Sequence, residues 1–331
     1  MLAIVAPGQG AQTAGFLRPW LADPTFAARL EWLGAVAGLD LTHYGTEADD
    51  DTIRDTKIAQ PLLVATAILT ALELFPPSGD GTPADLAGVG AVTGHSVGEI
   101  GAASFAGVLS PEQAMVLVRE RGNAMAAASA VTPTGMTAVL GGDRDEVLAY
   151  IEKHGLTAAN DNGPGQIVAA GTLEQLAAFA DDAPAKAKLR PLSVAGAFHS
   201  EHMTPAVEHV TRLSGAVPVH DARAPFISNA DGTVVRDGRE VLTKIVGQIA
   251  RPVRWDLCLE TMAGLGVTGI LELPPAGTLT GIAKRYFRGG PQPVETLALG
   301  GPDQVEAARE FCAKHADTTS DTVADDEGGA A

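Results

Sequence analysis

Ser96 is the residue of this chain best placed to act as a nucleophile. It lies in the segment Gly94-His95-Ser96-Val97-Gly98, which follows the apolar run 89–93 and precedes a helical stretch over 99–105. A glycine-x-serine-x-glycine segment between a strand and a helix is typical of a nucleophile elbow, a strained turn that holds the serine hydroxyl in a cleft. The backbone N–H of Val97, at the positive end of the helix, is then expected to face an oxyanion formed at the attacked carbonyl.

A serine nucleophile needs a base, and the chain has eight histidines. His199 follows the apolar run 189–195 and precedes a predicted helix over 201–213, which places it at a strand-to-helix edge where parallel-sheet enzymes carry catalytic groups. His95 neighbours the serine, but adjacent side chains on a sharp turn point apart, so we expect it to be a packing residue. His199 and His202 have the spacing of a metal pair without a third ligand, so we predict no metal site.

A glycine-rich turn ends the first predicted strand, in the segment Gly8-Gln9-Gly10-Ala11-Gln12. It does not fit a dinucleotide-binding fingerprint, because Thr13 occupies the place of the third glycine. Its better use is to bring a backbone N–H close to the elbow as the second oxyanion donor. The sequence predicts no cofactor.

Short apolar runs alternate with helical patterns along most of the chain. Such alternation predicts an α/β layered domain with a mostly parallel sheet. One predicted helix covers 61–75, and another covers 111–128, with Ser110 and Gln113 as a capping box. The predicted strands are 2–6, 89–93, 226–228, 267–273 and 296–299.

The stretch from 134 to 194 has a different pattern, in which the predicted elements follow in the order β-α-β-β-α-β. This order is typical of a ferredoxin-like subdomain. We therefore predict an α/β-hydrolase-like catalytic subdomain formed by 1–130 and 196–315, with a ferredoxin-like subdomain, 131–195, inserted into it. The segment 316–331 has five acidic residues and no aromatic one, so we predict a disordered acidic tail.

Composition excludes several classes of protein. The chain has 331 residues, 46% hydrophobic and 19% charged, and can build a large core. A formal charge of −17 argues against a general nucleic-acid binder or a binder of anionic membranes. Two cysteines exclude a disulfide framework, and the N-terminus lacks the features of a signal peptide. The apolar run 61–75 is shorter than a membrane span. We expect a cytoplasmic, monomeric protein.

Five segments in one order resemble the malonyl-CoA:acyl carrier protein transacylase family and the related acyltransferase domains of polyketide synthases. The resemblance covers roughly residues 2–300 and implies the same two-part architecture. The segments are Gly8-Gln9-Gly10-Ala11-Gln12, Gly94-His95-Ser96-Val97-Gly98-Glu99, Arg121-Gly122, Gly196-Ala197-Phe198-His199-Ser200 and Gln248-Ile249-Ala250-Arg251-Pro252-Val253-Arg254-Trp255.

What the resemblance implies is a ping-pong transfer with malonyl-CoA and acyl carrier protein as partners. Ser96 would attack the thioester of malonyl-CoA while His199 takes its proton. The backbone N–H groups of Gln9 and Val97 would hold the oxyanion. The backbone carbonyl of Gln248 would orient the histidine in place of a triad acid. The phosphopantetheine thiol of the carrier would then attack the malonyl-serine ester.

Substrate recognition is also implied by the resemblance. Arg121 matches the family's arginine, whose planar fork suits the free malonyl carboxylate. Arg119 must project from roughly the opposite side of the helix, so only one of the two faces the cleft. Asn160 and Asn162 resemble polar positions that border the thioester cleft. Phe198 is a bulky wall near the malonyl α-carbon, which favours malonyl over methylmalonyl by about 1–3 kcal/mol.

Alternatives from other classes use the same residues. A serine esterase or thioesterase would share the nucleophile, base and oxyanion donors, although Arg121 would place a cation in its pocket. A polyketide-type acyltransferase, or a non-catalytic scaffold that binds the carrier, would share the fold. Because carrier proteins of this family are acidic, docking requires local basic patches. Two sets are candidates: Lys186, Lys188 and Arg190, or Lys284, Arg285 and Arg288.

Overall fold

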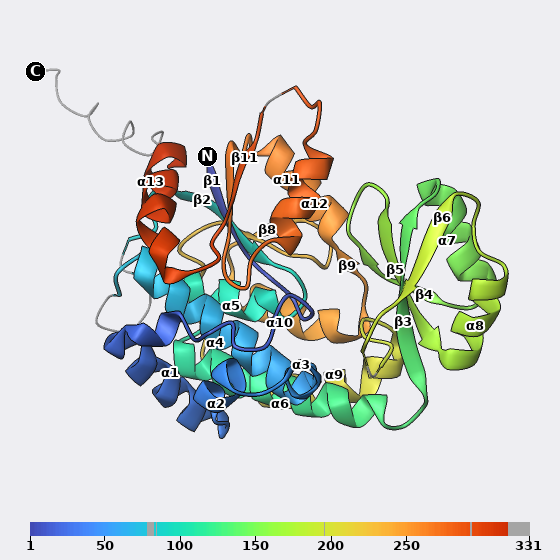
Figure 1. The fold of residues 1–331 in the computed structure, drawn as a ribbon, viewed down its shortest axis with the longest axis horizontal. Helices are drawn as coiled ribbons and strands as arrows, with labels where there is room; N and C mark the ends of the chain where they lie inside the picture. Colours follow the sequence, from blue (N-terminus) through green and yellow to red (C-terminus); the bar gives the residue numbers. More distant parts are fainter. Residues whose placement is uncertain (78–82, 84, 195, 292, 317–331) are drawn as a thin grey trace, which may run out of the picture.

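The apolar runs of the sequence form the centre of a six-stranded sheet (Figure 1). The computed structural model describes residues 1–77, 83, 85–194, 196–291 and 293–316. In the large sheet β1 pairs in parallel with β2 and β10, and all three strands are buried at every position. Its strands, in spatial order, are β11 (Glu295–Ala298), β10 (Gly269–Glu272), β1 (Leu2–Ala6), β2 (Val89–Gly94), β7 (Phe226–Ile227) and β8 (Val234–Val235). All five predicted strands therefore exist, in a sheet that is parallel except at β8.

Helices pack around this sheet. The longest are α4 (Thr56–Leu74) and α6 (Pro111–Ser129), which pack against each other. The other helices on the side of the large sheet, among the described residues, are α1 (Pro24–Ala37), α2 (Leu41–Thr46), α3 (Asp50–Ile53), α5 (Gly98–Phe105), α9 (Thr204–Ser214), α10 (Gly238–Gly247), α11 (Trp255–Gly264), α12 (Thr278–Tyr286) and α13 (Val305–His315). Short 3-10 turns lie at Trp20–Ala22, Glu201–Met203, Gln248–Ala250 and Pro302–Gln304.

Side-chain caps set the start of each of the two long helices. The predicted capping box of α6 is present, with Ser110 and Gln113 bonded to each other's backbone. The predicted start of α4 at Pro61 is wrong, because Asp55 caps the helix through Lys57 N and the proline lies inside it. α4 is long and apolar enough to cross a membrane, but 83% of its most apolar window is buried, so it is a core helix.

A second sheet of five strands stands beside the large one (Figure 1). Its elements follow in the chain as β3 (Thr134–Gly141), α7 (Arg144–Lys153), β4 (Thr157–Asp161), β5 (Gln166–Thr172), α8 (Leu173–Asp181) and β6 (Ala187–Pro191). The spatial order is β6-β3-β5-β4-β9, in which β9 (Val253–Arg254) pairs in parallel with β4. α7 and α8 cover the face away from the large sheet and close a separate small core around Phe179. The predicted tail lies outside the described residues, apart from Ala316.

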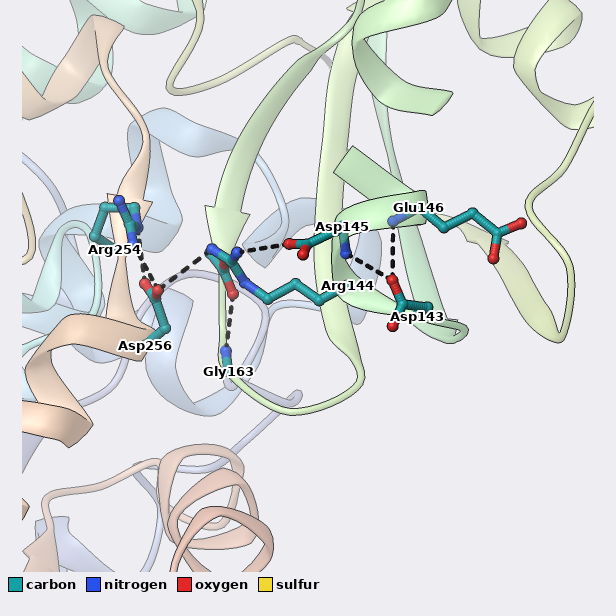
Figure 2. Close-up of polar contacts among 8 residues, drawn as sticks. Asp143, Arg144, Asp145, Glu146, Gly163, Arg254 and Asp256 are labelled. Carbon is teal, nitrogen blue, oxygen red and sulfur yellow. Dashed lines mark hydrogen bonds and ion pairs between the residues drawn. The ribbon is translucent and has the colours of Figure 1, made fainter. Parts of the chain in front are cut away.

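A cluster of charges joins the small sheet to the chain that leaves β9 (Figure 2). Arg144, at the start of α7, donates two hydrogen bonds to one oxygen of the buried Asp161, at 3.0 and 2.6 Å. The other Asp161 oxygen accepts from Gly163 N at 3.1 Å. Arg144 Nη2 also lies 3.7 Å from Asp256 Oδ2, and Asp256 is held by two bonds from Arg254. This cluster links α7 and β4 to the first turn of α11.

We expect Arg144→Met to lower the free energy of unfolding by about 1–3 kcal/mol, since it leaves the buried Asp161 carboxylate with a single donor. Adding Asp161→Asn should recover part of that loss, because the charge is gone while Gly163 N keeps its acceptor. Urea unfolding measures both variants. The control is Lys153→Met, which removes an exposed ion pair with Asp182 and should lower the free energy of unfolding far less. Equal losses in Arg144→Met and Lys153→Met would contradict the expectation.

Candidate active site

The elbow at Ser96 has the strained geometry that its sequence predicts. Ser96 has a φ of 52°, in the left-handed region, between the end of β2 and the start of α5. A Cβ on Gly94 would lie 2.1 Å from the carbonyl carbon of Gly98, and a Cβ on Gly98 would lie 2.3 Å from Ala6 O. Both glycines are therefore required for the turn to close against β1. His95 N, which donates to Ala6 O at 2.9 Å, ties the turn to the same strand.

His199 is the histidine that contacts the serine. Its Nε2 lies 2.7 Å from Ser96 Oγ, and its Nδ1 lies 2.8 Å from the backbone carbonyl oxygen of Gln248. Because a carbonyl only accepts, Nδ1 carries the proton and Nε2 presents a lone pair to the hydroxyl. Within the described chain no carboxylate contacts this imidazole. The pair is thus a dyad oriented by a backbone carbonyl.

The other histidines near the elbow do not contact Ser96 Oγ. His95 Nε2 lies 2.9 Å from Asn162 Oδ1, and its ring lies 5.7 Å from that of Trp255, so it packs as expected. His202 lies in the short 3-10 turn that precedes α9. In the part of the chain that the structure describes, no group of three or more histidine, cysteine or acidic side chains is placed to hold a metal ion.

Burial, followed by the positive charge of Arg121, lowers the pKa of His199 to about 3. The imidazole is neutral above this pKa, so the base form persists on the acid side of an ordinary histidine. We expect kcat/KM for acylation of Ser96 to stay flat from about pH 8 to about pH 5, with no fall near the ordinary histidine pKa of about 6.5. Pre-steady-state acylation rates measured across this pH range test the expectation. A midpoint near 6.5 would contradict the expectation.

Arg121 is a buried cation beside the nucleophile. It is 1% exposed on α6, and its Nη2 lies 3.3 Å from both Ser96 Oγ and Gln248 Oε1. Nη1 donates to Gln60 Oε1 at 2.7 Å, while Nε has no partner among the described residues. Burial lowers the pKa of Arg121 to about 10, which leaves it charged at neutral pH. No described carboxylate forms an ion pair with it.

Arg119 lies on the other side of the same helix, as the helical period predicts. It is only partly buried, and it bonds to Glu120 Oε1 at 2.9 Å and to Val36 O at 3.2 Å. Of the two arginines, only Arg121 therefore reaches the serine.

A cavity of about 90 Å³ opens above the dyad, between the two sheets. A cavity of this size holds a small group rather than a long acyl chain. Of the predicted site residues, Gln9, Val97, Asn160 and Phe198 line it. Asn162 is not among its lining residues, and acts instead on His95. The remaining lining residues are Gln60, His95, Ser96, Met125, Met136, Leu192, Val194 and His199.

Two residues that line this cavity have backbone N–H groups without a partner in the described chain. Neither Gln9 N nor Val97 N donates a hydrogen bond to another described residue. The glycine-rich turn is held in place by its side chains: Gln9 Nε2 donates to Arg54 O at 3.2 Å, and Gln12 Nε2 donates to Ile53 O at 3.1 Å. Two unpartnered donors beside a nucleophile are the equipment of an oxyanion hole.

Three site residues were not predicted. Gln60 contacts Arg121 from α4. Asn229 Oδ1 accepts from Ser96 N at 3.0 Å and its Nδ2 donates to Gly94 O at 2.5 Å, so it ties both ends of the elbow. Glu99, in the first turn of α5, is fully buried, and burial raises its pKa to about 8. The position of Asn229, after a strand that neighbours β2, is the one signal that could have found any of them.

Comparisons with known proteins find relatives that match most of this chain. The family model for the acyl transferase domain matches residues 4–319. The malonyl CoA-acyl carrier protein transacylase of Mycobacterium tuberculosis is 47% identical over 292 residues, 88% of this chain and 95% of its own length. The Bacillus subtilis protein of the same name is 33% identical, covering 93% of this chain and 96% of its own length.

Solved structures give the same result. The crystal structure of the M. tuberculosis enzyme has a TM-score of 0.86 at 45% identity and covers 93% of this chain and 99% of its own. A malonyl-transacylase solved with a type II polyketide synthase acyl-carrier protein has a TM-score of 0.84 at 26% identity, covering 93% of this chain and 99% of its own. The chain therefore belongs to the acyl transferase family, among the malonyl-CoA:acyl carrier protein transacylases.

Proposed function

We propose that this enzyme transfers a malonyl group from malonyl-CoA to the phosphopantetheine thiol of an acyl carrier protein, supplying fatty acid synthesis, with polyketide synthesis as the second candidate pathway. The observation that carries the proposal is Arg121. A buried guanidinium without a carboxylate partner in the described chain, 3.3 Å from the nucleophile, fits an anionic acyl group better than a neutral ester. The same observation disfavours an esterase that uses the same dyad.

The first half-reaction forms a malonyl ester on Ser96. His199 Nε2 takes the hydroxyl proton as Oγ attacks the thioester carbonyl carbon. The N–H groups of Gln9 and Val97 donate to the resulting oxyanion, and Gln248 O stabilises the imidazolium through Nδ1–H. As the intermediate collapses, the C–S bond breaks and the CoA sulfur leaves with the proton from His199.

The second half-reaction runs the same steps in reverse with a different thiol. The phosphopantetheine thiol gives its proton to His199 and attacks the ester carbonyl of malonyl-Ser96. Collapse breaks the bond to Oγ, which takes the proton back. Because Nδ1 stays bonded to Gln248 O throughout, one imidazole serves as base and acid in turn.

The cavity supports a preference for small acyl groups. Phe198, 7% exposed, lines it next to His199, and we propose that its ring favours malonyl over methylmalonyl. Asn160 borders the thioester from β4. Asn162 affects the thioester site indirectly, because it holds the ring of His95, which lines the cavity.

We also propose the finer architecture: an α/β-hydrolase-like subdomain formed by 1–130 and 196–315, and a ferredoxin-like subdomain formed by 131–195. The mostly parallel order of the large sheet and the order β6-β3-β5-β4, with both helices on one face, support this division. The pairing of β9 with β4 brings a strand from outside 131–195 into the small sheet. A cytoplasmic monomer fits the composition.

Carrier docking is proposed on one of the two basic sets. One set is exposed at the edge strand β6, with Lys188 and Arg190 on the strand and Lys186 just before it. The other set is exposed where α12 ends, with Lys284 and Arg285 in its last turn and Arg288 just after it. Either set would offset the net charge of −17 toward an acidic partner.

Incubation with malonyl-CoA alone tests the proposed function. The intact protein should gain the mass of one malonyl group, and peptide mapping should place it on Ser96. Addition of holo acyl carrier protein should then remove it and malonylate the carrier. Hydrolysis of malonyl-CoA that outpaces this transfer would favour a thioesterase instead.

A further inference from the structure

Glu99 is a buried carboxylate that the mechanism above does not use. It is 0% exposed and forms no ion pair with a described cation. One oxygen accepts from Asn229 N at 2.7 Å, and the other accepts a very short hydrogen bond from Gln248 Nε2. Because burial of a carboxylate is costly, its retention three residues after the nucleophile needs a reason.

The contacts of Glu99 and Asn229 together determine which way the amide of Gln248 points. The Glu99 oxygen that meets Gln248 accepts from its NH₂, so the NH₂ points toward Glu99. The same NH₂ donates to Asn229 Oδ1 at 2.8 Å. The amide oxygen of Gln248 is therefore left facing Arg121, whose Nη2 lies 3.3 Å away. Since guanidinium only donates, an amide turned the other way would set donor against donor.

We propose that Glu99 is a positioning residue for the malonyl carboxylate: through the Gln248 amide it holds the guanidinium of Arg121 against Ser96 Oγ. The proposal rests on the proposed malonyl transfer. The backbone carbonyl of Gln248, which orients His199, has independent support. His199 N donates to Ile249 O at 3.2 Å and Arg251 N donates to Gln248 O at 3.2 Å. Glu99 thus acts on recognition of the acyl group more than on the base.

A substitution of nearly equal shape separates this role from simple packing. In Glu99→Gln the new NH₂ must face a donor, either Asn229 N or the amide of Gln248. The contact between two donors at Gln248 is removed only if the Gln248 side-chain amide rotates by half a turn, and that rotation points its NH₂ at Arg121, which also only donates. We expect KM for malonyl-CoA to rise about tenfold or more, while kcat/KM for acetyl-CoA transfer changes less than about twofold.

The matched control is Glu272→Gln. Glu272 is also 0% exposed, but it accepts from the first turn of α12, at Gly277 N, Leu279 N and Thr280 N, away from Ser96. It should lose stability without changing the ratio of malonyl to acetyl transfer. Equal losses toward both acyl-CoA esters in Glu99→Gln would overturn the proposal.

A second variant covers the case in which Glu99→Gln does not fold. Gln248→Met removes the amide and keeps the backbone carbonyl, so it should show the same malonyl-selective rise in KM. In that background Glu99→Gln, where soluble, should add less than about twofold, because its route to Arg121 is gone. A Gln248→Met variant with unchanged malonyl KM would overturn the proposal.

A crystal structure of Glu99→Gln, or of Gln248→Met where the first does not fold, tests the link without activity. Arg121 Nη2 is expected to leave Ser96 Oγ; an unmoved guanidinium would overturn the positioning role. Wild-type protein assayed in parallel separates the two claims. Wild type without malonyl transfer would refute the proposed function, while the crystallographic result still decides whether Glu99 positions Arg121.

Discussion

Replacing Ser96 by alanine is expected to abolish labelling by malonyl-CoA and to lower the transfer rate by at least about a thousandfold. The reason is that no other described residue lining the cavity carries a hydroxyl or a thiol. Of the two cysteines, Cys258 is fully buried and burial raises its pKa well above the ordinary value, so it cannot substitute. Intact mass after incubation with malonyl-CoA, and transfer to holo carrier, measure the two effects.

Ser104→Ala is the matched control for this loss. Ser104 is a buried serine on α5, the helix that follows the elbow, and it does not line the cavity. It should label and transfer like wild type. A Ser96→Ala variant that still acquired a malonyl group, or still transferred at the wild-type rate, would mean that the nucleophile lies elsewhere or that the chain acts as a scaffold.

Arg121→Ala should lower kcat/KM for malonyl-CoA by about a hundredfold or more and leave acetyl-CoA transfer unchanged or faster. Malonyl carries a free carboxylate that would pair with the guanidinium in a site shielded from water, where a charged hydrogen bond is strong. An acetyl group carries no carboxylate, so it gains nothing from the guanidinium, and removal of Arg121 also removes a buried charge from its binding site. Steady-state kinetics with both acyl-CoA esters and one carrier protein measure the switch.

Arg119→Ala provides the comparison on the same helix. Its side chain contacts Glu120 and Val36 O rather than the site, so both acyl-CoA esters should react within about twofold of wild type. Thermal unfolding of each variant separates a lost contact from lost folding, because Arg121→Ala leaves the amide oxygens of Gln60 and Gln248 without a donor. Equal loss toward both esters in a folded Arg121→Ala variant would contradict the role of the carboxylate.

Local patterns predicted the elements more accurately than their ends. Strand β1 lies where the sequence places it, and Ser110 caps α6 as expected. The start of α4 was misplaced, because a proline that suits a first turn also fits inside this helix after Asp55 has begun it. Capping and burial patterns are local, whereas the choice between two competing starts depends on what the helix packs against.

Site residues that a local motif identifies were predicted from the sequence. Site residues that are recognisable only by their contacts with distant parts of the chain were not. Ser96 and the glycines around it were evident because one turn of chain contains all the steric conditions of an elbow. Helical period showed that only one of Arg119 and Arg121 could face the site. Glu99 and Asn229 were missed, since the hydrogen bond between them joins residues 130 positions apart.

Local patterns in the sequence pointed to Ser96 as the candidate nucleophile, to His199 as its candidate base and to the layered α/β class, because each depends on spacing within a few residues. Arg121 was indicated by the resemblance to the transacylase family. Only the tertiary structure decided how these residues meet: that His199 approaches Ser96 through Nε2, that its Nδ1 lies 2.8 Å from the carbonyl oxygen of Gln248, and that the guanidinium lies against the hydroxyl. Such distances arise where the ends of separate strands converge, and packing of the two sheets, rather than any local pattern, sets where those ends lie.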